Sequence, residues 1–136
     1  MSTATELVSR PAVTPPYDIV RAAYAELQVT DLAASERFYA ERLGMIVAER
    51  TTDAVYLRGW EERLHHSLVL RRAPVAAAAR LGFRVRGEED LDLLAEDLDA
   101  RGLTVAWVNA PDPGSGRVLR AWDPFGYPLE IGRAHV

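Results

Sequence analysis

The same order of strand and helix signals occurs twice in this chain, and this duplication restricts the fold more than any other feature. Residues Tyr24–Thr30 alternate apolar and polar side chains, the pattern of a half-buried strand. A helical pattern begins after Asp31, at an N-cap position, and stops at Gly44. Three more strand patterns follow, at Met45–Glu49, Ala54–Arg58 and His66–Arg71. The first half is therefore predicted to be a βαβββ unit.

The second half repeats this order. Arg80–Val85 alternates like the first strand, Glu88–Arg101 is an acidic amphipathic helix, and Gly102 takes the place of Gly44. The last three strands are predicted at Thr104–Val108, Val118–Trp122 and Pro128–Ile131. Aligning Leu27 with Phe83 gives an offset of 56 residues between the halves. We predict an α+β fold with two βαβββ repeats, residues 22–72 and 79–132.

A chain of 136 residues is long enough for one domain. We expect a tail at 1–18 and a single domain at 19–136. One helix covers only one face of a four-stranded unit, so the two units should pair into a cup-like, eight-stranded mixed sheet. Any ligand would lie on the face opposite the helices. The candidates on that face are Tyr24, Glu26, Arg71, Arg80, Arg84 and Glu130, with Gln28, Ser67 and Val69 beside them.

Composition excludes several classes of function. The chain has no cysteine, which removes disulfides, thiolate metal sites and cysteine nucleophiles. A net charge of −4 disfavours nucleic acid as a partner. All 16 basic residues are arginine, so no lysine is present for a Schiff base. Neither a membrane-spanning apolar stretch nor a signal peptide is recognisable, and a cytoplasmic location without membrane contact is expected.

Two motifs carry a resemblance to a known superfamily. The first is Leu27-x-Val29-x-Asp31-Leu32-x-x-Ser35-x-x-Phe38-Tyr39-x-x-x-Leu43-Gly44, and the second is Asp123-Pro124-x-Gly126-x-x-Leu129-Glu130-Ile131. They resemble the opening signature and the closing hairpin of the vicinal-oxygen-chelate superfamily, which includes glyoxalases, bleomycin-resistance proteins and dioxygenases. Because one motif lies in each half, the resemblance extends over the whole predicted domain.

A narrower resemblance rests on short segments in both halves. They are Asp18-Ile19-Val20-Arg21, Tyr56-Leu57-Arg58, Glu61-Glu62, His65-His66-x-Leu68-Val69-Leu70-Arg71 and Phe83-Arg84-Val85. These segments resemble the first module of homoprotocatechuate (3,4-dihydroxyphenylacetate) 2,3-dioxygenases and other catechol 2,3-dioxygenases. The resemblance implies two modules in tandem, with Fe(II) or Mn(II) held by the second. We expect this chain to be the N-terminal, non-catalytic module, with a catalytic module or a homo-oligomer as its partner.

The superfamily's metal-ligand positions support that expectation. The resemblance places ligands on the first and last strands of each repeat, where this chain has Tyr24, Val69, Arg80 and Glu130. Of these residues only Glu130 is a typical ligand, and one carboxylate is too few to hold Fe(II). We therefore predict no metal, no cofactor and no catalytic residue within this chain.

The sequence leaves two alternatives for the role of the cup. Arg71, Arg80 and Arg84 could bind an aromatic carboxylate, although an internal ion-pair network with Glu26 and Glu130 is favoured. The chain could alternatively be a stand-alone, dimeric, drug-sequestering protein of the bleomycin-resistance kind, with a small aromatic ligand in its metal-free cup. Strand alternation places His66 on the face away from the cup, so it is not expected to contribute to either site.

Overall fold

The computed structural model describes residues 17–133, so most of the predicted tail lies outside the described part. The strands are β1 (Ile19–Val29), β2 (Ile46–Arg50), β3 (Ala54–Arg58), β4 (Leu68–Arg72), β5 (Ala77–Val85), β6 (Val105–Asn109), β7 (Arg117–Trp122) and β8 (Pro128–Arg133). The helices are α2 (Leu32–Glu36), a π-helical segment η1 (Arg37–Arg42), and α3 (Glu88–Ala100). Each half thus has the predicted order of strand, helix and three strands.

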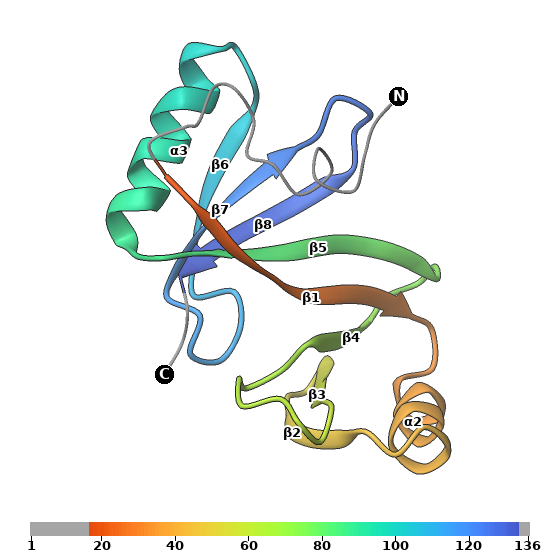
Figure 1. Cartoon of the computed structure of the whole chain (residues 1–136). Helices are drawn as coiled ribbons and strands as arrows, with labels where there is room; N and C mark the ends of the chain where they lie inside the picture. The colour runs from red at the N-terminus through yellow and green to blue at the C-terminus, as the bar shows by residue number, and fades with distance from the viewer. Residues whose placement is uncertain (1–16, 134–136) are drawn as a thin grey trace, which may run out of the picture.

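One open, mixed sheet contains all eight strands in the order β2-β3-β4-β1-β5-β8-β7-β6. The first strand of each half pairs in parallel with the last strand of the same half, β1 with β4 and β5 with β8. β1 and β5 pair antiparallel in the middle and join the two halves (Figure 1). This arrangement confirms the predicted α+β fold with two βαβββ repeats.

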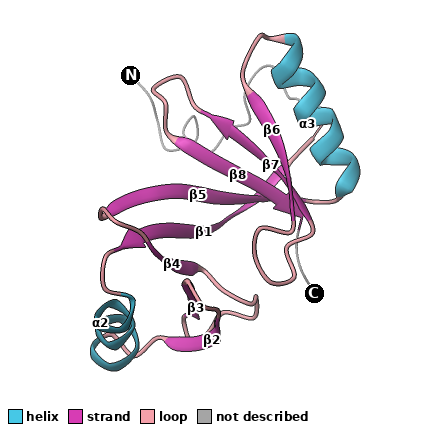
Figure 2. Ribbon diagram, turned by 180° about the vertical axis from the view of Figure 1, so that it is seen from behind, coloured by secondary structure: helices cyan, strands magenta, loops and turns pink. Residues whose placement is uncertain are grey.

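The helices cover the two halves separately. α2 packs at the β3–β4 end of the sheet, whereas α3 lies against β5, β6, β7 and β8 (Figure 2). Asp31 caps α2 by accepting a hydrogen bond from the backbone nitrogen of Ala34 at 3.0 Å. Gly44 and Gly102 end the two helical segments, and both have a φ of +76°, which glycine adopts without steric cost.

Each helix closes its own hydrophobic core against the sheet. The core under α2 contains Leu32, Val55, Leu57 and Leu70, and the core under α3 contains Val85, Leu91, Leu94, Leu119, Ala121 and Ile131. Because side chains alternate along a strand, these apolar positions place the intervening residues on the opposite face, inside the cup. The described part of the chain contains no helix with the length and hydropathy of a membrane span.

Two strands differ from the sequence-based prediction in a way that affects the site. β1 begins at Ile19 instead of Tyr24, because its first residues pair with the second half of β5, as in Ala22 with Phe83. β4 begins at Leu68 instead of His66. Tyr24 therefore lies in the middle of a long central strand, and His66 lies in the loop before β4.

Candidate functional site

The six predicted cup residues do come together on the face opposite the helices. Strand pairing places Glu26 beside Val69 on one side and beside Arg80 on the other. Glu130 pairs with Gly82 of β5, the position that follows Glu26 by the repeat offset of 56 residues. Val69 and Glu130 thus occupy equivalent places in the two halves, as the sequence predicts.

Alternating acidic and basic side chains form a continuous chain across this face. We call it the cup network, and in order it consists of Asp112, Arg71, Glu26, Arg80, Glu130 and Arg120. Arg71 Nη2 lies 2.6 Å from Asp112 Oδ1 and 3.3 Å from Glu26 Oε1. Arg80 bridges Glu26 and Glu130, at 3.7 Å to each. Three guanidinium groups therefore balance the three buried carboxylates of the cup, and Arg71 Nη1 also lies 3.7 Å from the exposed carboxylate of Asp53.

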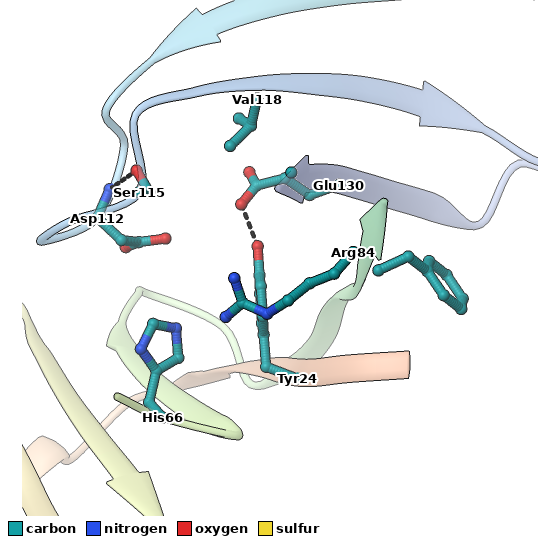
Figure 3. Close-up of a pocket in the computed structure, with 9 residues that line it drawn as sticks. Tyr24, His66, Arg84, Asp112, Ser115, Val118 and Glu130 are labelled. Carbon is teal, nitrogen blue, oxygen red and sulfur yellow. Dashed lines mark hydrogen bonds between the residues drawn. The ribbon is translucent and has the colours of Figure 1, made fainter. Parts of the chain in front are cut away.

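Glu130 is the best-satisfied member of the cup network. Its side chain, only 3% exposed, accepts hydrogen bonds from the Tyr24 hydroxyl on Oε1 and from Arg120 Nε at 2.9 Å on Oε2. Tyr24 reaches Glu130 from β1 by crossing over Gly82 of β5, which has no side chain to block the ring. Figure 3 shows the hydrogen bond between the Tyr24 hydroxyl and Glu130. Both carboxylate oxygens of Glu130 thus accept hydrogen bonds from protein side chains.

The pKa of Tyr24 is raised well above its usual range by burial, and the neighbouring Glu130 carboxylate raises it further. A tyrosine with such a pKa stays protonated at neutral pH and does not act as a base. Burial likewise raises the pKa of Tyr56, whose hydroxyl donates to Asp112 Oδ1 at 2.6 Å. Both tyrosines therefore serve as hydrogen-bond donors to buried carboxylates.

Asp112 enters the cup from the loop between β6 and β7. This loop closes with a hydrogen bond from the Ala110 nitrogen to the Gly116 oxygen at 2.6 Å, and Ala110 has a positive φ of 42°. Burial lowers the pKa of Arg71, but the charges and hydrogen bonds of Glu26 and Asp112 outweigh it and raise the pKa overall. A loop of the second repeat thereby supplies the counter-charge for an arginine of the first.

The predicted orientation of His66 is wrong. His66 is 2% exposed and faces the cup, with its ring centroid 5.3 Å from that of Tyr24 and 5.0 Å from that of Tyr56. Its Nδ1 lies 2.8 Å from Nδ1 of His65. The alternation rule fails here because His66 precedes the first residue of β4, and loop residues do not follow the strand period.

His66 adds a possible metal-ligating side chain to the cup. His66, Asp112 and Glu130 line one small cavity, but so does the guanidinium of Arg84, which lies near His66 and Tyr24 (Figure 3). Among residues 17–133, no three histidine or acidic side chains are placed to hold a metal ion. A cavity that contains the buried guanidinium of Arg84 and a Glu130 already paired with Arg120 does not fit an Fe(II) or Mn(II) site.

The cup has a small enclosed cavity, besides wider open hollows next to Gly82 and next to Arg71. The enclosed cavity is lined by Tyr24, His66, Phe83, Arg84, Asp112, Ser115, Val118, Glu130 and Gly132. Its free volume for a water-sized sphere is about 10 Å³, roughly what one water molecule needs. An aromatic ring does not fit this space unless the cup network opens.

Sequence reasoning missed three members of the site. Arg120 and Tyr56 could have been found, because they alternate with the apolar residues of β7 and β3 that face the helices. Asp112 gave no such signal, since it lies in a loop whose path is set by tertiary contacts.

Arg84 was expected in an ion-pair network, but within residues 17–133 it makes no ion pair and donates from Nη1 to the Arg133 oxygen at 3.0 Å.

Replacing Tyr24 with phenylalanine is expected to lower the free energy of unfolding by about 2 kcal/mol, the usual value of a hydrogen bond to a charged group. The ring stays in place over Gly82, while Glu130 loses one of its donors. Urea denaturation measures the difference. Tyr127→Phe, at a residue 66% exposed, is the matched control and should have little effect. Equal losses in both variants would contradict the assigned contact.

Comparison with known proteins gives one family match. Residues 21–131 match the model of the Glyoxalase/Bleomycin resistance protein/Dioxygenase superfamily. The manganese-dependent 2,3-dihydroxybiphenyl 1,2-dioxygenase of Geobacillus genomosp. 3 is 30% identical over 84% of this chain and 36% of its own length. Metapyrocatechase of Geobacillus stearothermophilus is 30% identical over 86% of this chain and 36% of its own length.

Solved structures give the same result. An extradiol ring-cleaving dioxygenase from B. fuscum superposes with a TM-score of 0.84 at 42% identity, over 91% of this chain and 35% of that one. The complex of homoprotocatechuate 2,3-dioxygenase from Brevibacterium fuscum with 3,4-dihydroxyphenylacetate has the same TM-score at 40% identity. The match covers 95% of this chain and 40% of that one. The present chain thus spans less than half the length of these relatives.

Proposed function

The chain belongs to the glyoxalase/bleomycin resistance protein/dioxygenase superfamily, and from this premise we propose that it is a non-catalytic module of an extradiol ring-cleaving dioxygenase. In this proposal it corresponds to the N-terminal module, and the complete enzyme acts on catechols of the homoprotocatechuate type. The Fe(II) or Mn(II) of that enzyme lies in a second, catalytic module. The role of the present chain is to fold independently and to pack on that module or on neighbouring subunits.

One observation carries the proposal. At the four positions where the superfamily resemblance places metal ligands, the chain has Tyr24, Val69, Arg80 and Glu130, and the carboxylate of Glu130 is occupied by Tyr24, Arg80 and Arg120. Arginine and valine do not ligate cations. The fold is therefore retained while its chemistry is replaced by an ion-pair network that joins the two repeats.

The comparisons support the rest of the proposal. The matched relatives include a 2,3-dihydroxybiphenyl 1,2-dioxygenase and an extradiol ring-cleaving dioxygenase, and this chain covers only 35 to 36% of their length. The alternative, a drug-sequestering protein with an aromatic ligand in the cup, finds no comparable support. The enclosed cavity in the cup has about 10 Å³ of free space, too little for such a ligand. A ligand of that size would have to bind instead in the open hollow of about 480 Å³ beside Tyr56, Arg71 and Asp112.

The first test is a measurement of metal binding and ring cleavage on the chain alone. After anaerobic incubation with Fe(II) or Mn(II) and desalting, we expect no stoichiometric metal by elemental analysis. With 3,4-dihydroxyphenylacetate and O₂, we expect no ring-cleaved product. Stoichiometric metal together with turnover would refute the non-catalytic assignment.

A chimera tests the modular role directly. The matched segment of the Brevibacterium fuscum homoprotocatechuate 2,3-dioxygenase is replaced with this chain, which superposes on it with a TM-score of 0.84 over 95% of its length. We expect the chimera to bind metal and to cleave 3,4-dihydroxyphenylacetate. The same enzyme with its segment deleted is the control. A folded chimera without activity would argue that the chain is not an equivalent module.

A further inference from the structure

Among the arginines of the cup, Arg84 differs because no carboxylate of residues 17–133 balances its buried charge. Its side chain belongs to β5 and is buried, with the whole residue 3% exposed. Nη1 donates to the Arg133 backbone oxygen at 3.0 Å, a neutral acceptor. Nε and Nη2 are fully buried and have no hydrogen-bond partner among residues 17–133.

The surrounding carboxylates do not supply the missing charge, because they are already neutralised. The cup network pairs Arg71, Arg80 and Arg120 with Glu26, Asp112 and Glu130, three cations with three anions. Arg84 lies beside this balanced set as an additional cation. Burying an uncompensated guanidinium costs several kcal/mol, so an anion beside it would be strongly favoured.

The free space beside Arg84 limits the size of that anion. Arg84 lines the cavity of about 10 Å³ described above, which is close to the volume of one water molecule. A water molecule could accept the two N–H hydrogen bonds, but it would leave the charge unbalanced. A carboxylate or phosphate group is too large for the space, whereas a single-atom anion such as chloride is only moderately larger than a water molecule.

We propose that the cup contains a binding site for a monatomic, halide-type anion, held by Nε and Nη2 of Arg84. The Tyr24 hydroxyl is engaged by Glu130, and the Asp112 carboxylate by Tyr56 and Arg71, so the Arg84 guanidinium is the charged group with unused donors at this cavity. His66 and Ser115 complete the polar part of its lining. Phe83 and Val118 form part of the apolar wall. Such an anion neutralises the cup and thereby stabilises the junction between the two repeats.

Chloride is the probe in the test, since an anion that binds only the native state raises Tm by mass action. Tm is measured in potassium chloride and in potassium gluconate at equal ionic strength, because gluconate is too large for the cavity. For the wild type we expect a saturable chloride-dependent rise of about 4 °C. Arg84→Met should abolish this response.

The control variant is Arg86→Met, which removes an exposed guanidinium two residues away and the same formal charge. It should keep the full chloride response, which separates a specific site from general effects of salt. Arg84→Met should also be at least as stable as the wild type in gluconate, because it removes an uncompensated buried charge. An equal Tm of the wild type in both salts would overturn the proposal, as would a chloride response retained in Arg84→Met.

Wild-type crystals soaked in sodium bromide give a measurement that does not depend on any variant. We expect an anomalous difference peak at hydrogen-bonding distance from Nε and Nη2 of Arg84. A water molecule at that place without anomalous signal would overturn the proposal, even if Arg84→Met fails to fold.

Discussion

Replacing Gly82 with alanine is expected to destabilise the protein by about 3 kcal/mol or more, because the new methyl group overpacks a filled site. A Cβ atom at this position would overlap three atoms of the Tyr24 ring, which crosses Gly82 to reach Glu130. The ring has no room to retreat, since it is also packed against His66. Urea denaturation of Gly82→Ala and the wild type measures the loss.

A double variant separates this steric explanation from a general intolerance of β5 to substitution. With Tyr24→Ala as the background, Gly82→Ala should become neutral or slightly stabilising, because glycine itself weakens a strand. Gly87→Ala is the matched control, since its extended backbone accepts alanine and no atom lies within 4 Å of the added Cβ. If Gly82→Ala costs the same with and without the Tyr24 ring, the proposed crossing of the ring over Gly82 is wrong.

Replacing Glu130 with leucine is expected to cost about 3 to 5 kcal/mol, the range for removing one partner of a buried ion pair. Arg120 would lose its carboxylate, Arg80 would keep only Glu26, and the Tyr24 hydroxyl would lose its acceptor. Against a total stability of about 5 to 15 kcal/mol, a loss of this size would be close to unfolding the protein. Denaturation by urea at neutral pH would measure it.

Two further variants define the origin of that loss. Glu61→Leu removes an exposed glutamate from the loop after β3 and should change stability by less than about 0.5 kcal/mol. Arg120→Met combined with Glu130→Leu should recover part of the loss, since the arginine left unpaired is removed with its partner. A Glu130→Leu variant as stable as Glu61→Leu would show that the cup network does not hold the repeats together.

Much of the fold could be predicted from the sequence because its signals are local and occur twice. The strand pattern at Ala54–Arg58 gave β3 with its bounds, and the glycines at 44 and 102 gave the two helix ends. The early part of β1 could not be predicted in this way. Ile19 to Ala23 are ordered as a strand by their pairing with β5, and such long-range pairing leaves no period in the local sequence.

The site was predictable to the extent that it lies on strands. Tyr24, Glu26, Arg71 and Glu130 were assigned to the cup because apolar neighbours on the same strands had to face the helices. His66 and Asp112 lie in loops, where no such period applies, and the structure brings both into the cup. Which arginine pairs with which carboxylate also required the structure, since the four arginines and three buried carboxylates of the cup could be paired in several ways.

The sequence by itself determined the superfamily fold, the repeat and which residues stand at the superfamily's ligand positions, because these depend on side-chain type and on local period. Three contacts were decided by the tertiary structure alone. Asp112 binds Arg71, the Tyr24 ring crosses Gly82 and donates to Glu130, and the Arg84 guanidinium is buried without a carboxylate partner among residues 17–133. The physical reason is distance. Ion pairs and hydrogen bonds depend on contacts of a few ångströms between strands and loops far apart in the chain, and only the folded sheet sets those contacts.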